Sequence, residues 1–132
     1  MVEINYPTVE HIIEFNHLAL ALVRVKKADK PAVLSKPKLH EIVEECQNAP
    51  SDVYDKAVVL LTGIIKKHPF ASGNRRTAFA VAMEFLLVNS ASTPLLVKQK
   101  SEKVLLGIRE SYYSNEEISE WLKTGEIRAF KR

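Results

Sequence analysis

Apolar residues recur every three or four positions along most of this chain, a spacing that gathers them on one face of an α-helix. The segments 8–27, 37–47 and 52–67 show this spacing, and the segment 74–89 is apolar on nearly all of its sides. Strand-like alternation is missing from the sequence, although 93–97 is compatible with a brief extended piece. The sequence therefore predicts an all-α fold, a compact helical bundle around the central apolar helix 74–89.

Local signals predict where several of the helices begin. Thr8 and Ser51 are predicted N-caps, because a side-chain oxygen at that position can accept a hydrogen bond from the first turn. Pro37 suits a first turn, where no amide donor is required. A further helix is predicted over 101–111, and the capping box Ser114-Asn-Glu-Glu117 predicts the start of a last helix.

Length and composition favour one soluble domain over residues 1–132. The chain is 46% hydrophobic and 27% charged, which is typical of a globular protein. No apolar run reaches the roughly 18–20 residues that cross a bilayer, and the N-terminus lacks the features of a secretory signal. Cys46 has no second cysteine with which to form an internal disulfide, as is usual in a reducing compartment. We expect a cytoplasmic protein without membrane contact.

The net charge of +3 is a mild excess and a weak indicator of nucleic-acid binding. Its distribution is more informative, because no acidic residue lies between Asp55 and Glu84. The basic residues in this interval are Lys56, Lys66, Lys67, Arg75 and Arg76. We predict a positive potential there that suits an anionic ligand.

The connection that precedes the helix 74–89 combines features of an anion site. The first amides of a helix have no intrahelical partner, and the helix dipole favours negative charge there. Gly73 lets the backbone approach a ligand closely. Arg75 and Arg76 carry forked donors that match phosphate oxygens. His68, just upstream, is able to exchange a proton near neutral pH.

Taken singly, each of these residues also has an ordinary structural interpretation. His68 can be a solvated side chain at a helix end, and the two arginines can be surface charge. Gly73-Asn74 can be a plain turn. Phe70 is expected to be a structural anchor that packs the loop into the core.

Taken together, the residues His68-Pro-Phe-Ala-Ser-Gly-Asn-Arg-Arg76 resemble the signature of the Fic/Doc superfamily, His-x-Phe-x-(Asp/Glu)-(Gly/Ala)-Asn-(Gly/Lys)-Arg. The resemblance is sharpest over 60–89, and the continuation Arg-Arg-Thr-Ala is closest to the Doc, or death-on-curing, branch. It implies a helical transferase that moves part of ATP or another nucleoside triphosphate to a protein hydroxyl. The moved group is usually a nucleoside monophosphate in Fic proteins (AMPylation). In Doc toxins, which act as kinases on an elongation factor, it is the terminal phosphate.

The resemblance also implies a role for each matching residue. His68 would be the general base for the target hydroxyl, and Arg76 would hold phosphate oxygens and stabilise charge in the transition state. The residues that would bind the nucleotide phosphates are Gly73, Asn74, Arg75 and Arg76.

Two positions depart from the family pattern. Ser72 stands where the family has an acidic Mg²⁺ ligand, and a hydroxyl is a poor substitute because Mg²⁺ is usually held through carboxylates and substrate phosphates. The ion could be held by phosphates and water, another carboxylate could bind it, or activity could be weak or lost. The alternative function is thus a catalytically impaired protein that binds nucleotide or a partner without turnover. Arg75 replaces the glycine of Fic proteins, which favours phosphate transfer.

The sequence also bears on a partner chain, on nucleic-acid binding and on metal binding. The family's inhibitory motif, Ser/Thr-x-x-x-Glu, is missing from the sequence, which predicts a separate antitoxin chain over the site. A basic nucleic-acid-binding module is a distant third hypothesis, without a recognisable motif. No metal site is predicted, because the single cysteine and the four histidines show no metal-type spacing; the histidines are His11, His17, His40 and His68.

Overall fold

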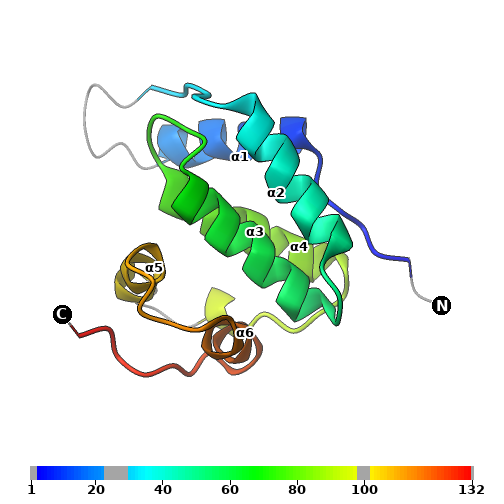
Figure 1. Cartoon of the computed structure of the whole chain (residues 1–132), viewed down its shortest axis with the longest axis vertical. Helices are drawn as coiled ribbons and strands as arrows, with labels where there is room; N and C mark the ends of the chain where they lie inside the picture. The colour runs from blue at the N-terminus through cyan, green and yellow to red at the C-terminus, as the bar shows by residue number, and fades with distance from the viewer. Residues whose placement is uncertain (1–2, 23–29, 98–101, 132) are drawn as a thin grey trace.

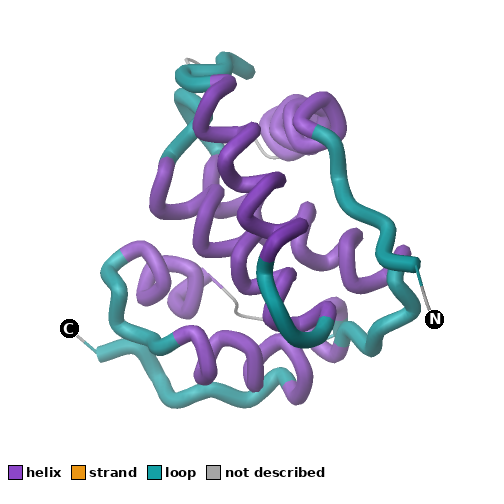
Figure 2. The backbone as a smooth tube through the Cα atoms, turned by 45° about the vertical axis from the view of Figure 1, so that its right-hand side comes forward, coloured by secondary structure: helices purple, strands orange, loops and turns teal. Residues whose placement is uncertain are grey.

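A computed structural model describes residues 3–22, 30–97 and 102–131. Within these ranges the chain forms helices and loops and no β-strand (Figure 2), so the predicted all-α class is confirmed. The elements are α1 (Val9–Leu22), α2 (Lys36–Asn48), α3 (Val53–Lys67), α4 (Asn74–Val88), the short 3-10 helix η1 (Pro94–Leu96), α5 (Glu102–Arg109) and α6 (Asn115–Thr124).

Helix α3 lies at the centre of the bundle. It packs against α4 along its length, with α2 on one side and α5 and α6 on the other (Figure 1). Helix α4 packs between α3 and α1. The central position predicted for the segment 74–89 is therefore shared with α3, because α3 contacts α2, α4, α5 and α6. The end of α4 is partly exposed at Leu87 and Val88.

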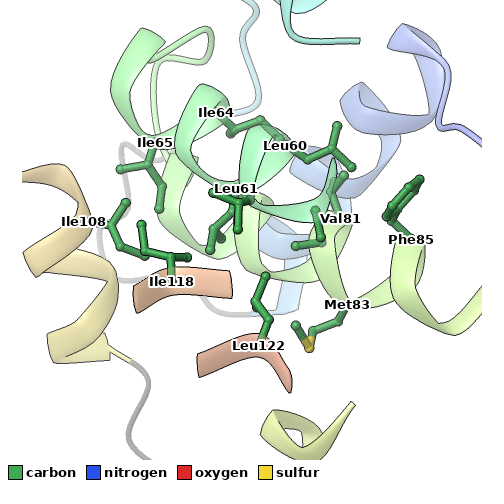
Figure 3. Packing of buried hydrophobic residues seen from close by; sticks show 14 of the residues in the cluster. Leu60, Leu61, Ile64, Ile65, Val81, Met83, Phe85, Ile108, Ile118 and Leu122 are labelled. Atoms are coloured by element: carbon green, nitrogen blue, oxygen red, sulfur yellow. The ribbon is translucent and has the colours of Figure 1, made fainter. Parts of the chain in front are cut away.

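The core joins these helices through large aliphatic side chains. Ile65 of α3 lies near Ile108 of α5 and Ile118 of α6, so one position of α3 meets both C-terminal helices (Figure 3). Leu60 of α3 and Val81 of α4 meet on the other side of the cluster. Burial of such side chains contributes about 1.5–3 kcal/mol each, and this packing fixes the α3–α4 pair that carries the loop described below.

Several predicted helix starts are confirmed. The amide of His11 donates to Thr8 Oγ1 over 3.1 Å at the start of α1. Pro37 lies in the first turn of α2. The capping box of α6 forms in both directions between Ser114 and Glu117.

The predicted cap of α3 is wrong. The cap of α3 is Asp52, whose carboxylate accepts from the Asp55 amide over 3.0 Å, whereas Ser51 turns away with φ +83°. A carboxylate at an N-terminus also gains from the helix dipole. Within 93–97, where the sequence also permits a brief extended piece, Pro94–Leu96 form η1, and the Leu96 amide bonds to the Thr93 carbonyl.

The remaining boundaries are close to the predicted ones. Helix α1 is described to Leu22, and the predicted extension to residue 27 lies outside the described residues. Helix α5 covers 102–109 of the predicted 101–111. None of the helices in the described part of the chain is long and apolar enough to span a membrane.

Candidate functional site

The loop 68–73 joins the antiparallel helices α3 and α4. His68 ends α3 as its C-cap, with φ 54° and ψ 57°, and its amide bonds to the Ile64 carbonyl over 3.3 Å. Pro69 disfavours a right-handed helical conformation at His68. Few non-glycine residues adopt left-handed values, although histidine does so more often than most. The helix therefore stops with an exposed imidazole at the start of the loop.

Phe70 fixes the loop to the protein. Its side chain is fully buried, and its backbone forms an isolated antiparallel bridge with Val33. On either side of this bridge, the Leu34 amide donates to Pro69 over 2.7 Å and the Ala71 amide donates to Ala32 over 2.9 Å. A segment that precedes α2 thus braces the loop through its backbone.

The side chain of Asn74 closes the loop from within. It is only 5% exposed, and its Oδ1 accepts from the Phe70 amide over 3.1 Å. Its Nδ2 donates to the Phe70 carbonyl over 2.8 Å and lies 3.2 Å from Nδ1 of His68. The Asn74 side chain is therefore engaged with the loop itself. A contact of Asn74 with phosphate would therefore come from its backbone amide and not from its side chain.

A second asparagine, Asn16 of α1, holds the loop from the opposite side. It is 1% exposed, and its Nδ2 donates to the Ser72 carbonyl over 2.9 Å and to Thr77 Oγ1 over 3.1 Å. A buried amide that lost these partners would be costly. Helix α1 is thus tied to both the loop and the first turn of α4.

Gly73 is the N-cap of α4 and supplies no side-chain hydrogen bond to its first turn. Its φ of 75° lies in the left-handed region, and a Cβ there would lie 3.0 Å from Cδ2 of Leu20. Glycine is therefore required by conformation and by space. Gly73 therefore provides no side-chain cap at this helix start, where backbone amides and the positive end of the dipole favour an anion.

The two arginines leave the first turn of α4 in different directions. Arg76 Nη1 lies 3.4 Å from the Ala19 carbonyl, near the described end of α1. Arg75 Nη2 forms an ion pair of 3.1 Å with Glu102 of α5, and Arg75 Nε is buried without a hydrogen-bond partner. A phosphate would have to compete with Glu102 for Arg75.

The predicted positive potential over the interval from Asp55 to Glu84 is weaker than the sequence indicates. Lys56 is buried and donates to carbonyls at the end of α2, the shortest contact being 2.6 Å to Ala49. Lys67 faces Glu45 of α2 at 3.6 Å. Lys56, Lys67 and Arg75 are therefore all engaged in contacts within the protein.

The residues at the loop do not fit the Mg²⁺ site of the family signature. Ser72 presents a neutral hydroxyl and is half-buried. No group of three or more His, Cys, Asp or Glu side chains that could hold a metal occurs in the ranges 3–22, 30–97 and 102–131. Glu102 is an acidic residue that contacts the signature, through its ion pair with Arg75.

The structure thus brings His68, Phe70, Gly73, Asn74 and Arg76 together around one turn. A model of the Fic/DOC family matches residues 6–86, more than half of the chain. The chain belongs to the Fic/DOC family. The matched part extends from before α1 to near the end of α4, so it contains the whole loop and its braces. No curated protein matches the chain.

The groups that hold this loop in place are not apparent from the sequence. Asn16 lies 56 positions before its partner Ser72, so the sequence gives no indication of which group it bonds. The one available signal is that Asn16 falls on the apolar face of α1, between Ile12 and Leu20, where a polar residue needs a partner.

Proposed function

We propose that this chain uses a nucleoside triphosphate, such as ATP, to modify a hydroxyl group of another protein. Fic/DOC proteins typically transfer a nucleoside monophosphate or a phosphate to proteins. This proposal rests on the position of His68, which is exposed beside the start of α4, where Gly73 leaves the first turn without a side-chain cap.

In the proposed reaction the phosphate oxygens lie against the backbone amides from Gly73 to Arg76. His68 accepts the proton of the target hydroxyl as the hydroxyl oxygen bonds to phosphorus. The bond from phosphorus to the leaving group breaks at the same time; this group is the nucleoside diphosphate when phosphate is transferred and pyrophosphate when a nucleoside monophosphate is transferred. The helix amides and the Arg76 guanidinium stabilise the charge that builds on the phosphoryl oxygens. Binding a multiply charged anion to amides that are already ordered avoids the cost of arranging donors during the reaction.

We propose further that the transferred group is the terminal phosphate, as in Doc toxins. Arg75 occupies the second position of α4, where the Fic signature has glycine. Its side chain extends toward Glu102 and occupies space beside the first turn. A triphosphate placed in the Fic manner would meet this side chain, whereas a terminal phosphate needs only the end of the helix.

Doc-like phosphate transfer also suggests two partners, a target protein and an antitoxin. The target is a cytoplasmic protein such as an elongation factor, and a separate antitoxin chain covers the site from His68 to Arg76. One leucine next to the loop favours a covering partner. Leu34, whose amide bonds to Pro69 of the loop, is 63% exposed. Full access of nucleotide to the site in the natural complex would contradict this partner.

A second candidate function rests on Ser72. With a hydroxyl in place of the acidic ligand, the chain would bind nucleotide or a partner and not turn over. Restoring the acid with Ser72→Asp separates the two candidates. A large gain in Mg²⁺-dependent transfer supports the impaired protein, and unchanged robust transfer supports the active enzyme.

The experiment that tests the proposed function is protein labelling in a cell lysate with α-labelled and γ-labelled ATP in parallel. We expect labelling of a protein band from γ-labelled ATP only, and we expect His68→Ala to abolish it. His40→Ala is the matched control, because His40 is an exposed histidine of α2 outside the signature. Labelling from α-labelled ATP alone would refute phosphate transfer. Labelling that survives His68→Ala would refute the role of His68 as the base.

A further inference from the structure

The amide group of Asn74 has one possible orientation. Its Oδ1 faces the Phe70 N–H at 3.1 Å and its Nδ2 faces the Phe70 carbonyl at 2.8 Å. Rotating the amide by half a turn would place oxygen against the carbonyl oxygen and NH₂ against the N–H, so both contacts would become repulsive. Phe70 is fully buried and its neighbours are bonded to the segment 32–34, so the backbone cannot turn to suit another arrangement.

This orientation determines what His68 meets. One proton of Asn74 Nδ2 is directed to Phe70, and the second is available for Nδ1 of His68, which lies 3.2 Å away. An amide nitrogen donates and does not accept hydrogen bonds, so Nδ1 must be the acceptor. A neutral imidazole carries one proton, and that proton must then be on Nε2.

We propose that Asn74 is a positioning residue that holds neutral His68 as its Nε2–H tautomer. The resting protein then presents a hydrogen-bond donor beside the start of α4, because Nε2 has no partner among the described residues and His68 is exposed. This arrangement suits a phosphate oxygen, which accepts hydrogen bonds. It does not suit a hydroxyl that has to give up a proton.

A consequence for the reaction follows, and it rests on the proposed function. Nε2 can accept the proton of a target hydroxyl only when Nδ1 carries the ring proton. Reaching that state requires loss of the Nε2 proton to water, gain of a proton at Nδ1, and separation of Nδ1 from the Asn74 amide. Release of the Asn74–His68 hydrogen bond is therefore the step that converts His68 from a donor into a base.

The test is a two-bond ¹H–¹⁵N NMR correlation of the histidine rings in the full chain. The spectrum is recorded without nucleotide and above the usual titration range of histidine, where the rings are neutral. A His68→Gln variant identifies the signals of His68. We expect protonated Nε2 and unprotonated Nδ1 in His68, with a larger fraction of this tautomer than in exposed His40. A His68 ring protonated on Nδ1, or a mixture equal to that of His40, would overturn the proposal.

Two variants link the tautomer to Asn74. In Asn74→Ala the fraction of Nε2–H tautomer is expected to fall to that of His40. In Asn74→Asp, whose carboxylate can only accept, the proton is expected to move to Nδ1. An unchanged His68 signal in folded Asn74→Ala would overturn the assignment. If neither variant folds, the wild-type spectrum alone decides.

The outcome is independent of the labelling experiment. If the protein labels its target and His68 is protonated on Nδ1, the proposed function stands and the inference about Asn74 is wrong. If the protein labels nothing and His68 is the Nε2–H tautomer, the positioning role of Asn74 stands and the proposed transferase activity is wrong.

Discussion

Asn16 in α1 donates a hydrogen bond of 2.9 Å to the carbonyl oxygen of Ser72, which lies 56 positions later in the chain. The same nitrogen bonds to Thr77 in the first turn of α4 at 3.1 Å. One buried side chain therefore sets the spacing between α1, the loop and the helix whose first amides we assign to phosphate binding.

We predict that Asn16→Ala destabilises the protein by about 1–3 kcal/mol, because it leaves a buried carbonyl and a hydroxyl without their donor. Urea unfolding measures this change. Asn115→Ala, at an exposed position of α6, is the control and should change the free energy of unfolding by less than about 0.5 kcal/mol. Equal stabilities of the two variants would show that Asn16 does not hold the loop.

The contrast between Asn16 and the helices shows what the sequence can predict. Helix positions follow from apolar spacing, so the α3–α4 pair and the loop between them were placed correctly to within a residue or two. The family signature marks the candidate site because its residues are consecutive in the sequence. The N-cap of α3 is harder to predict, because Ser51 and Asp52 are adjacent and both can cap a helix.

Contacts between distant residues could not be predicted. The pair Arg75–Glu102 joins α4 to α5, and the Asn16–Ser72 bond joins α1 to the loop. Such pairs depend on how the helices pack, and no local pattern encodes them. The residues of the candidate site are therefore named by the sequence, whereas the groups that orient them are not.

His68 has a backbone conformation that suits glycine better. At φ 54° a Cβ is unfavourable, and glycine is the usual residue at this position after a helix. We expect His68→Gly to be about 1 kcal/mol more stable than His68→Ala, with both variants inactive in protein labelling. Thermal unfolding of the two proteins tests this difference.

Ser111 provides the control for that comparison, because it has φ 58° and lies after α5, outside the family signature. Ser111→Gly should be more stable than Ser111→Ala by a similar amount, with labelling unchanged in both. A His68→Gly variant no more stable than His68→Ala would contradict the strained conformation at His68.

Gly73 should tolerate no side chain. Its φ of 75° and the 3.0 Å approach of a Cβ to Leu20 predict that Gly73→Ala loses about 1–2 kcal/mol of stability and weakens ATP binding. Gly125, with φ 80° at the end of α6, gives the matched control. Gly125→Ala should lose stability through the same backbone strain and keep ATP binding, measured by calorimetry. Wild-type ATP affinity in Gly73→Ala would contradict the role of this turn.

The contribution of the Glu117–Arg128 ion pair to stability should be lost in acid. Hydrogen bonds from the Arg128 guanidinium lower the pKa of Glu117 from 4.5 to about 2. A carboxyl whose pKa is lower in the folded state stabilises the fold above its unfolded pKa, and this contribution is lost as the pH falls from about 4.5 to 2.

Glu117→Gln isolates this effect, because glutamine keeps the capping box with Ser114 and removes the charge. We expect the melting temperatures of wild type and variant to differ at neutral pH and to converge toward pH 2. A difference that is constant over this range would mean that the Glu117–Arg128 pair contributes nothing to stability.

The most direct test of the phosphate site is an amide ¹H–¹⁵N NMR titration of the whole chain with ATP. We expect the largest shifts at the backbone amides of Gly73, Asn74, Arg75 and Arg76, and we expect these shifts to saturate together. Saturable shifts centred on other parts of the protein, with these four amides unmoved, would contradict phosphate binding at this turn.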